Sequence, residues 1–287
     1  MKLHYYQAPV GNFGDDLNPW LWPKLLPGVF DDDDRVLFLG IGTLLSVKAP
    51  HGPLKVVFGS GVGYPDKAPQ LDGRWQIRVL RGPLTARTLG VSEDLAITDP
   101  AILVRLFPLP AVEKRHRFSY MPHFRSATVG QWKEVCERIG LHYIDPRAGV
   151  ETCLKAISAS EVLICEAMHG AIVADALRIP WIIVRANSHH SEGAMDVFKW
   201  SDWSASLNLS VTYHALFPLW GRHADEGTLQ RSRRRIKEEM TAFQLRRLMR
   251  RGQPCLSREQ LLDAALSRLQ EKLGEFKRDV ASGRLAP

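Results

Sequence analysis

The chain has 287 residues, of which 45% are hydrophobic and 24% charged, a composition that excludes disordered, fibrous and disulfide-rich classes and indicates a folded globular protein. This length exceeds that of a usual single domain, so we predict two domains, residues 1–108 and 117–287, divided at the proline-containing stretch 106–116. The formal net charge is +7, and residues 231–251 account for all of it with eight Arg, one Lys and two Glu.

The first predicted strand, residues 3–6, leads into a loop of sequence GNFGDDLNPW at 11–20. Its glycines permit backbone conformations that are closed to other residues, so the loop can hold a sugar hydroxyl or a phosphate. Asp15 is the favoured functional residue here, whereas Asp16 and Asn18 have helix capping as their alternative role. The polar side chains of the loop are Asn12, Asp15, Asp16 and Asn18.

Two further strands are predicted at Val36–Leu39 and Val56–Phe58, each followed by a glycine turn of a doubly wound sheet. Neither turn completes GxGxxG, and the sequence holds no GxxxxGK[ST], which disfavours nicotinamide dinucleotides and P-loop nucleotide hydrolysis. The four consecutive aspartates at 31–34 are interpreted as a solvated loop, and we predict no metal there.

A strand at 77–80 is predicted to end at Arg81, beside the start of a helix. A guanidinium at the carboxyl end of a strand and next to a helix N-terminus suits a carboxylate or phosphate oxygen. An ion pair with Asp94 or Asp99 is the alternative. Residues 97–99 are predicted to form one more strand end.

The second half begins with a predicted strand at 118–121, which ends at His123. A helix at 129–139 and a strand at 141–144 are predicted to follow. This is again the alternation of strand and helix that is typical of a parallel sheet.

Apolar runs at 162–165 and 181–184 flank a small, apolar helical segment at 171–177, which predicts two parallel strands joined by a crossover helix. His169 lies in the turn after the first of these strands, where ligands bind in open α/β sheets and helix N-termini favour anions. Gly170 would let backbone and ligand approach closely. The alternative is a histidine that caps the helix or packs in a satisfied pocket.

The basic stretch 231–251 predicts a helix on which Ile236, Met240 and Phe243 share one face with arginines around them. We expect this segment to rest on an anionic membrane surface. Phosphates, an acidic polymer, or plain solvation of a charged helix are the alternatives. The other apolar side chains, Leu245, Leu248 and Met249, fall on another side.

Ser257 and Gln260 resemble a capping box, which predicts the start of a final helix. The helix is amphipathic, so its apolar stripe must be buried against another element. That stripe comprises Leu262, Ala265, Leu266, Leu269, Leu273 and Phe276. His189 and His190 are interpreted as polar surface residues of a loop.

The four cysteines form no CxxC pair and have no histidine at zinc-finger spacing, so neither a disulfide framework nor a structural zinc site is indicated. The first residues, MKLHYYQAP, lack the apolar segment of a signal peptide, and no apolar run approaches the ~20 residues that span a bilayer. We expect a cytoplasmic protein, with peripheral contact to the inner face of the plasma membrane.

Several stretches at successive predicted strand ends together resemble the polysaccharide pyruvyl transferase family, and most closely its branch that ketalises bacterial exopolysaccharides. The resemblance spans most of residues 8–187. The stretches that carry it are GNFGDD at 11–16, LRGPLTARTLG at 80–90, ITDPAIL at 97–103, YMPHF at 120–124 and EAMHGAIVADALRIPWIIV at 166–184.

The resemblance implies an α/β fold like that of GT-B glycosyltransferases, in which two Rossmann-like doubly wound domains face each other across a cleft, here with C-terminal helices added. It also implies that phosphoenolpyruvate is the donor substrate and that no cofactor and no metal is required. The acceptor, expected on the N-terminal domain, would be a lipid-linked oligosaccharide or a polysaccharide.

The resemblance implies roles for individual residues as well. His169 matches the family histidine, and with Asp15 as the acceptor of a hydroxyl proton it is expected to be catalytic. Many family members have an arginine two positions before that histidine, where this chain has Ala167, so other groups must hold the donor. The expected donor-binding residues are Arg81, Arg125, Arg185, His123 and Gly170. The expected acceptor-binding residues are Asn12, Asp16 and Asn18.

Two other functions compete with this one. A GT-B glycosyltransferase with a nucleotide-sugar donor would share the architecture and could use the same glycine turns for a diphosphate. A protein that binds nucleic acid through residues 231–251 is disfavoured, because the basic residues lack interleaved aromatic residues for base stacking and no RRM or KH signature occurs.

Overall fold

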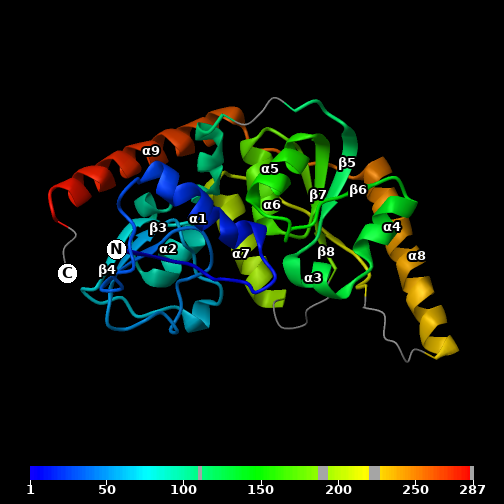
Figure 1. The fold of residues 1–287 in the computed structure, drawn as a ribbon, viewed down its shortest axis with the longest axis horizontal. Helices are drawn as coiled ribbons and strands as arrows, with labels where there is room; N and C mark the ends of the chain where they lie inside the picture. The colour runs from blue at the N-terminus through cyan, green and yellow to red at the C-terminus, as the bar shows by residue number, and fades with distance from the viewer. Residues whose placement is uncertain (109–111, 187–192, 220–226, 285–287) are drawn as a thin grey trace.

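The computed structural model describes residues 1–108, 112–186, 193–219 and 227–284. Within them the chain forms two parallel β-sheets with helices packed on both (Figure 1). The predicted α/β class is therefore confirmed. No helix of these residues has the length and apolar character needed to cross a bilayer.

The first sheet has the strand order β1-β2-β3-β4, and every neighbouring pair is parallel. Its β2 and the last three residues of β3, 56–58, are buried, as their apolar sequences predict. The strands are β1 (Lys2–His4), β2 (Val36–Leu39), β3 (Leu54–Phe58) and β4 (Trp75–Val79). The helical elements of this half are α1 (Phe13–Leu25), η1 (Pro65–Lys67), α2 (Pro83–Leu89), η2 (Glu93–Leu95) and η3 (Pro100–Leu106), where η marks a 3₁₀ helix.

The second sheet has the strand order β6-β5-β7-β8-β9 and is also parallel throughout. The strands predicted around the turn of His169 are neighbours in it, as expected. Its strands are β5 (His116–Met121), β6 (His142–Tyr143), β7 (Ser160–Cys165), β8 (Trp181–Arg185) and β9 (Tyr213–Ala215). The helices are α3 (Phe124–Val129), α4 (Trp132–Arg138), α5 (Val150–Ser158), α6 (Met168–Ala176), α7 (Gly193–Ser206), α8 (Thr228–Arg251) and α9 (Glu259–Ala281).

Two predicted elements differ from the structure. Residues 97–99 form no strand: the isolated bridge beside them joins Leu80 and Ala96, and the chain enters η3 at Pro100. The expected helix at 129–139 corresponds to α4, which begins only at Trp132, because the backbone at Gly130 is extended and separates α4 from the short preceding helix α3. Short apolar segments next to Gly or Pro do not reveal such breaks by their periodicity alone.

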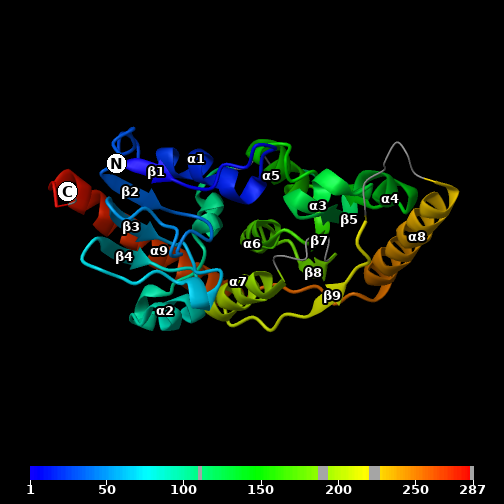
Figure 2. The same ribbon diagram turned by 90° about the horizontal axis from the view of Figure 1, so that it is seen from below.

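The last helix, α9, returns to the first sheet (Figures 1 and 2). The ring of Phe276 lies 5.5 Å from that of Phe38 and 5.9 Å from that of Phe58, on the face that also receives Trp22 of α1. The predicted stripe of α9 is thus buried against the N-terminal half. An aromatic side chain buried in this way contributes about 3–5 kcal/mol relative to alanine.

The predicted capping box at Ser257 is wrong, because α9 begins one residue later and its N-cap is Arg258. The backbone N–H of Ser257 instead donates to Oδ2 of Asp175 at 2.9 Å, and its hydroxyl contacts Oδ1 of the same carboxylate. Ser257 therefore fastens the segment before α9 to the end of α6.

The two sheets share one continuous apolar core, to which Phe38 of the first sheet and Leu163 and Ile183 of the second all belong. Helix α1 packs against α5 and α6, and η3 packs against α6. Because the halves meet through this core, the division at 106–116 and the GT-B arrangement of two domains across a cleft stay predictions.

Candidate functional site

The strand order of the second sheet places a crevice at the carboxyl ends of β5 and β7. From these two adjacent strands the chain crosses over in opposite directions, to β6 on one side and to β8 on the other. Ligands of open α/β sheets bind at such a switch point. Met121 pairs with Cys165 in the ladder, so both strands end at the same level and the residues that follow them, His123 and Glu166, lie side by side.

A cavity of about 350 Å³ opens at this point, and both halves of the chain line it. Its walls come from the loop before α1, the turn after β2, and the segments that follow β5 and β7, with α7 closing one side. A cavity of this size is at the lower end of the range for small-molecule sites. Its charged, histidine and amide side chains are His4, Asn12, Asp15, Lys48, His123, Arg125, Glu166, His169, Asp196 and Lys199.

Asp15 lies in the first turn of α1 and faces this cavity. Burial raises the pKa of its carboxyl to about 6, against the opposing effects of nearby His169, of a hydrogen bond from Nδ2 of Asn12, and of Lys199. Gly42, at φ +130°, passes close by: a Cβ on it would meet Oδ1 of Asp15 at 3.4 Å. Such a carboxylate can accept a proton near neutral pH.

His169 is the second residue of α6, and its ring lies against the first turn of α1. A Cβ built on Gly14 would stand 2.1 Å from Nδ1 of His169, so only glycine leaves room for the ring. The GNFGDD and EAMHG stretches, far apart in the sequence, therefore meet where Gly14 contacts His169.

The other ring nitrogen of His169 faces Asp99. Nε2 lies 3.5 Å from Oδ2 of the fully buried Asp99, and neither atom has a hydrogen-bond partner among the described residues. Oδ1 of Asp99 accepts from the backbone N–H of Ala101 and so fixes the carboxylate at the start of η3. In structures without substrate, catalytic hydrogen bonds are often this long. Asp99 thus contacts His169 without lining the cavity, whereas His169 does line it.

Glu166 connects three strand ends. It follows β7, and its carboxylate accepts from the backbone N–H of His123 after β5 at 3.0 Å and from that of Ala186 after β8 at 3.3 Å. Burial raises the pKa of this carboxyl to about 7, which the two backbone hydrogen bonds partly oppose. Glu166 thus links the ends of three neighbouring strands and presents a titratable group to the cavity.

His123 and Arg125 both line the cavity, and their role in binding the donor stays a prediction. His123 is the N-cap residue of α3, and Arg125 is the second residue of that helix, with its guanidinium 5.5 Å from the ring of Phe124. Lys199, from the middle of α7, reaches the same cavity and interacts electrostatically with Asp15. The cavity therefore has cations on two sides.

Arg185 lies at the end of β8, beside the cavity rather than in its lining. Its Nε is 3.4 Å from Oδ2 of Asp196, and its guanidinium lies over the ring of Tyr213. Asp196 does line the cavity, so Arg185 pairs with a carboxylate of the lining without being part of the lining itself.

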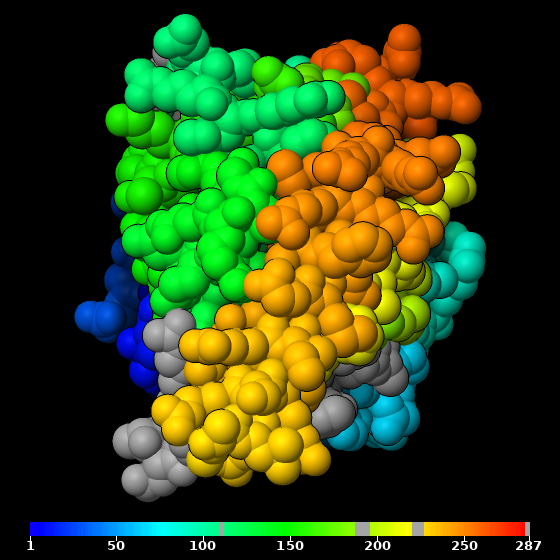
Figure 3. Space-filling view, turned by 90° about the vertical axis from the view of Figure 1, so that its right-hand side faces the viewer, coloured from blue at the N-terminus to red at the C-terminus, as the bar shows by residue number. Residues whose placement is uncertain are grey.

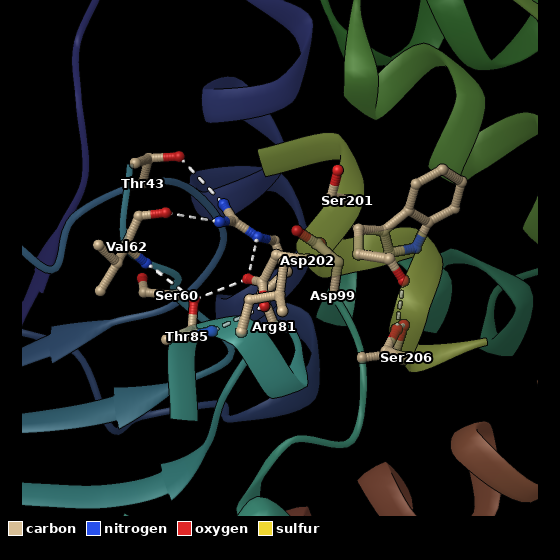
Figure 4. Close-up of polar contacts among 12 residues, drawn as sticks. Thr43, Ser60, Val62, Arg81, Thr85, Asp99, Ser201, Asp202 and Ser206 are labelled. Carbon is tan, nitrogen blue, oxygen red and sulfur yellow. Dashed lines mark hydrogen bonds and ion pairs between the residues drawn. The ribbon is translucent and has the colours of Figure 1, made fainter. Parts of the chain in front are cut away.

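Arg81 is placed elsewhere. It is fully buried, with Nε donating to Oδ2 of Asp202 at 3.0 Å and the other guanidinium nitrogens donating to Thr43 and to the carbonyl of Val62 (Figure 4). Neither alternative carboxylate expected from the sequence, Asp94 or Asp99, is its partner. Arg81 instead binds the first sheet to α7, and it does not line the cavity.

Three other predicted residues also stay out of the cavity lining. Asn18 is fully buried, where its amide donates to the carbonyls of Asp15 and Ile41 and accepts from Ile41 and Trp22. Asp16 accepts from the backbone N–H of Asn12, the N-cap residue of α1, and lies inside that helix rather than at its cap. Gly170 gives α6 a close approach to the sheet, since a Cβ there would meet Sδ of Met121 at 2.8 Å. The predicted His189 and His190 lie outside the described residues.

Sequence reasoning did not identify Lys48, Asp99, Glu166 or Lys199 as site residues. Glu166 belongs to the turn singled out at 166–170, so its position directly after a buried strand was an available signal. Asp99 had the comparable signal of an Asp-Pro at a helix start. Lys199 lies in the middle of a helix, so its sequence position gave no such signal. Among the described residues, no group of three or more His, Cys, Asp or Glu side chains could hold a metal ion, and the expectation of a metal-free reaction stays a prediction.

Comparison with known proteins agrees with these motifs. Residues 14–189 match the family described as polysaccharide pyruvyl transferase. The succinoglycan biosynthesis protein ExoV of Rhizobium meliloti (strain 1021) is 43% identical over 216 residues, which cover 74% of this chain and 66% of that protein, slightly less than two thirds of its length. No solved structure matches the chain. The match over more than half of the chain shows that the chain belongs to the polysaccharide pyruvyl transferase family.

Proposed function

We propose that this protein transfers pyruvate from phosphoenolpyruvate onto a sugar of a bacterial exopolysaccharide repeat unit, forming a cyclic pyruvyl ketal and releasing phosphate. The observation that carries the proposal is the cavity in which Asp15 from the first half meets His169 from the second, with Arg125 and Lys199 beside them. Membership of the pyruvyl transferase family and similarity to a protein named for succinoglycan biosynthesis support it.

The reaction makes defined chemical demands. C3 of phosphoenolpyruvate takes up a proton, C2 becomes electrophilic, and the oxygen of a first sugar hydroxyl bonds to C2 as that hydroxyl loses its proton. The bond between C2 and the phosphate oxygen then breaks, and a second hydroxyl bonds to C2 to close the ketal. Of the two hydroxyl protons, one balances the proton gained by C3 and the other leaves with the phosphate.

His169 is the proposed proton donor, either to C3 or to the departing phosphate. Its Nδ1 side faces Gly14 in the first turn of α1, Nε2 faces Asp99, and the residue lines the cavity. A carboxylate behind the far nitrogen orients a histidine ring and stabilises its protonated form, as in other acid–base pairs of this kind. Asp99 is therefore a positioning residue that acts through His169.

Asp15 is the proposed base that takes the proton of the attacking hydroxyl. A carboxyl whose pKa is about 6 is mostly ionised at neutral pH, yet is more basic than an ordinary aspartate. Asn12, which donates to Asp15 and lines the same cavity, can hold this carboxylate in place and contact the acceptor sugar.

Arg125 and Lys199 are the proposed partners of the phosphate and carboxylate of phosphoenolpyruvate. Ala167 occupies the position where many family members have an arginine, and it lines the cavity together with these two cations. Cations on either side of a small cavity can replace one arginine, since a phosphate offers several acceptor oxygens. His123 lies next to Arg125 and would contact the same donor groups.

The test supplies phosphoenolpyruvate and a crude lipid-linked oligosaccharide fraction, and measures phosphate release together with the mass of the acceptor. The expected result is acceptor-dependent phosphate release and a mass gain that matches a pyruvyl ketal. In a parallel melting experiment, phosphoenolpyruvate should raise the midpoint more than UDP- or GDP-sugars do, because a bound ligand stabilises the folded state. A larger shift with a nucleotide sugar would instead favour a glycosyltransferase.

A further inference from the structure

Helix α8 presents an apolar stripe to solvent. Leu229, Ile236, Met240 and Phe243 are 65, 59, 40 and 66% exposed, and their spacing of seven, four and three residues places them on one side of the helix. Large apolar side chains gathered in this way on one exposed face mark an interaction site more often than scattered ones do.

The opposite side of α8 is anchored to the protein. Leu245 is fully buried, Ala242 and Leu248 are nearly so, and Thr241 donates to the carbonyl of Phe217 at 3.0 Å. These residues join the core that covers the outer face of the second sheet. Helix α8 therefore has two apolar sides, of which one is packed against the protein and the other is the exposed stripe.

The exposed stripe is surrounded by positive charge. At 100° per residue, Arg247 and Arg250 continue the stripe toward the end of the helix, and Arg233 and Arg251 flank it, all of them exposed. The two glutamates of α8 do not offset this charge, because Glu238 pairs with Arg234 and Arg138, and Glu239 pairs with Arg138. From Leu229 to Arg250 the stripe extends over about 32 Å at the rise of an α-helix.

We propose that this face of α8, defined by Leu229, Ile236, Met240, Phe243, Arg247 and Arg250, is a docking surface for an anionic lipid bilayer. Apolar side chains on one face of a helix, with arginines beside them, are what an interfacial helix requires. Figure 3 shows α8, in gold to orange, crossing the face of the molecule that would meet the membrane. The cavity lies elsewhere, between the two sheets, so docking leaves the candidate site in place.

Other occupants fit the face less well. A second copy of the chain would bring arginines against arginines, and like charges across an interface are costly. Nucleic acid would use the arginines but would require aromatic residues for base stacking, and Phe243 is the one aromatic side chain among the six residues that define this face. A bilayer with acidic headgroups uses the arginines and the aliphatic side chains together.

The test is sedimentation of the full chain with vesicles of phosphatidylglycerol or of phosphatidylcholine. We expect binding to the anionic vesicles and little to the neutral ones. Arg247→Gln with Arg250→Gln should weaken the partition constant about 30-fold at low salt, at about fivefold per lost surface charge. A matched control, Arg35→Gln with Arg87→Gln, removes two exposed charges in the first half of the chain and should bind like the parent.

A second variant separates lipid docking from mere charge attraction. Ile236→Ser with Phe243→Ser keeps every arginine, so binding should fall at both low and high salt if the apolar stripe enters the bilayer. Unchanged binding of this variant, or no binding of the parent to anionic vesicles, would overturn the proposal. Concentration-dependent dimerisation of the parent that this variant abolishes would also overturn it, in favour of a second copy. The assay involves no turnover, so its result is independent of the proposed reaction.

Discussion

Gly14 lies so close to His169 that a β-carbon on the glycine would overlap the imidazole ring, at 2.1 Å from Nδ1. This contact joins the first turn of α1 to the first turn of α6, and it sets the position of His169 relative to Asp15, one residue further along α1. The geometry of the candidate site thus depends on the absence of a side chain at one residue.

Gly14→Ala should therefore displace the ring of His169 while leaving the rest of the core in place. We expect turnover to fall by about tenfold to 100-fold, since a shift of about 1 Å in a reacting group can cost as much. Steady-state kinetics with a melting curve would test this. Gly73→Ala is the matched control, because a Cβ there meets nothing within 4 Å. Equal activity of both variants would contradict the predicted role of the contact.

His169→Gln should keep the fold and lower turnover by about 100-fold to 10,000-fold, the range that is typical of a lost general acid or base. A residue that only binds the donor would instead raise KM for phosphoenolpyruvate and leave kcat unchanged. Kinetics with both substrates varied distinguish the two. His51→Gln, at an exposed position, serves as the control. A variant that turns over within a few-fold of the parent would remove His169 from the mechanism.

Asp99→Asn should lower kcat by about tenfold to 10,000-fold with little change in KM, because it removes the charge behind Nε2 of His169 but keeps the acceptor for the N–H of Ala101. A fall in kcat with KM unchanged, in a variant that melts like the parent, is a readout that a purely structural role would not give. An unchanged kcat with a lower melting temperature would show that Asp99 serves only the fold.

Asp15 should give kcat/KM an acidic limb near pH 6. Burial raises the pKa of this carboxyl to about 6, and a base works only when ionised, so activity falls as the pH drops below that value. Asn12→Ala removes a hydrogen bond that favours the ionised form, so the limb should move to higher pH. A limb that moves to lower pH, or does not move, would contradict this assignment.

Asp202→Asn should destabilise the fold by about 3–5 kcal/mol, because it leaves the charge of Arg81 buried without its ion-pair partner. Asp202 also accepts from the backbone N–H and the hydroxyl of Thr85, so the variant loosens the contact between α2 and α7. Urea unfolding measures the loss. Arg87→Gln breaks an exposed ion pair and should leave the unfolding midpoint nearly unchanged.

Local sequence was sufficient for the parts of the fold that depend on near neighbours. Apolar runs such as Val36–Leu39 and residues 181–184 are typical of buried strands, and the turn between β7 and α6 follows from the same pattern, so the residues alone place His169 at a strand end. The exposed and buried sides of α8 follow in the same way from the period of the α-helix.

Only the tertiary structure decided which of these strand ends face one another. Arg81 and Arg125 look alike in sequence, each at the end of a strand and the start of a helix, yet Arg125 reaches the cavity while Arg81 is buried against Asp202, 121 residues away. The contact of Asp99 with His169 and the packing of α9 against the first sheet could not be predicted from the sequence either. The periodicity of apolar residues indicates that a side chain is buried. Which side chain it contacts depends on how elements distant in the sequence pack together, and that packing involves the whole core.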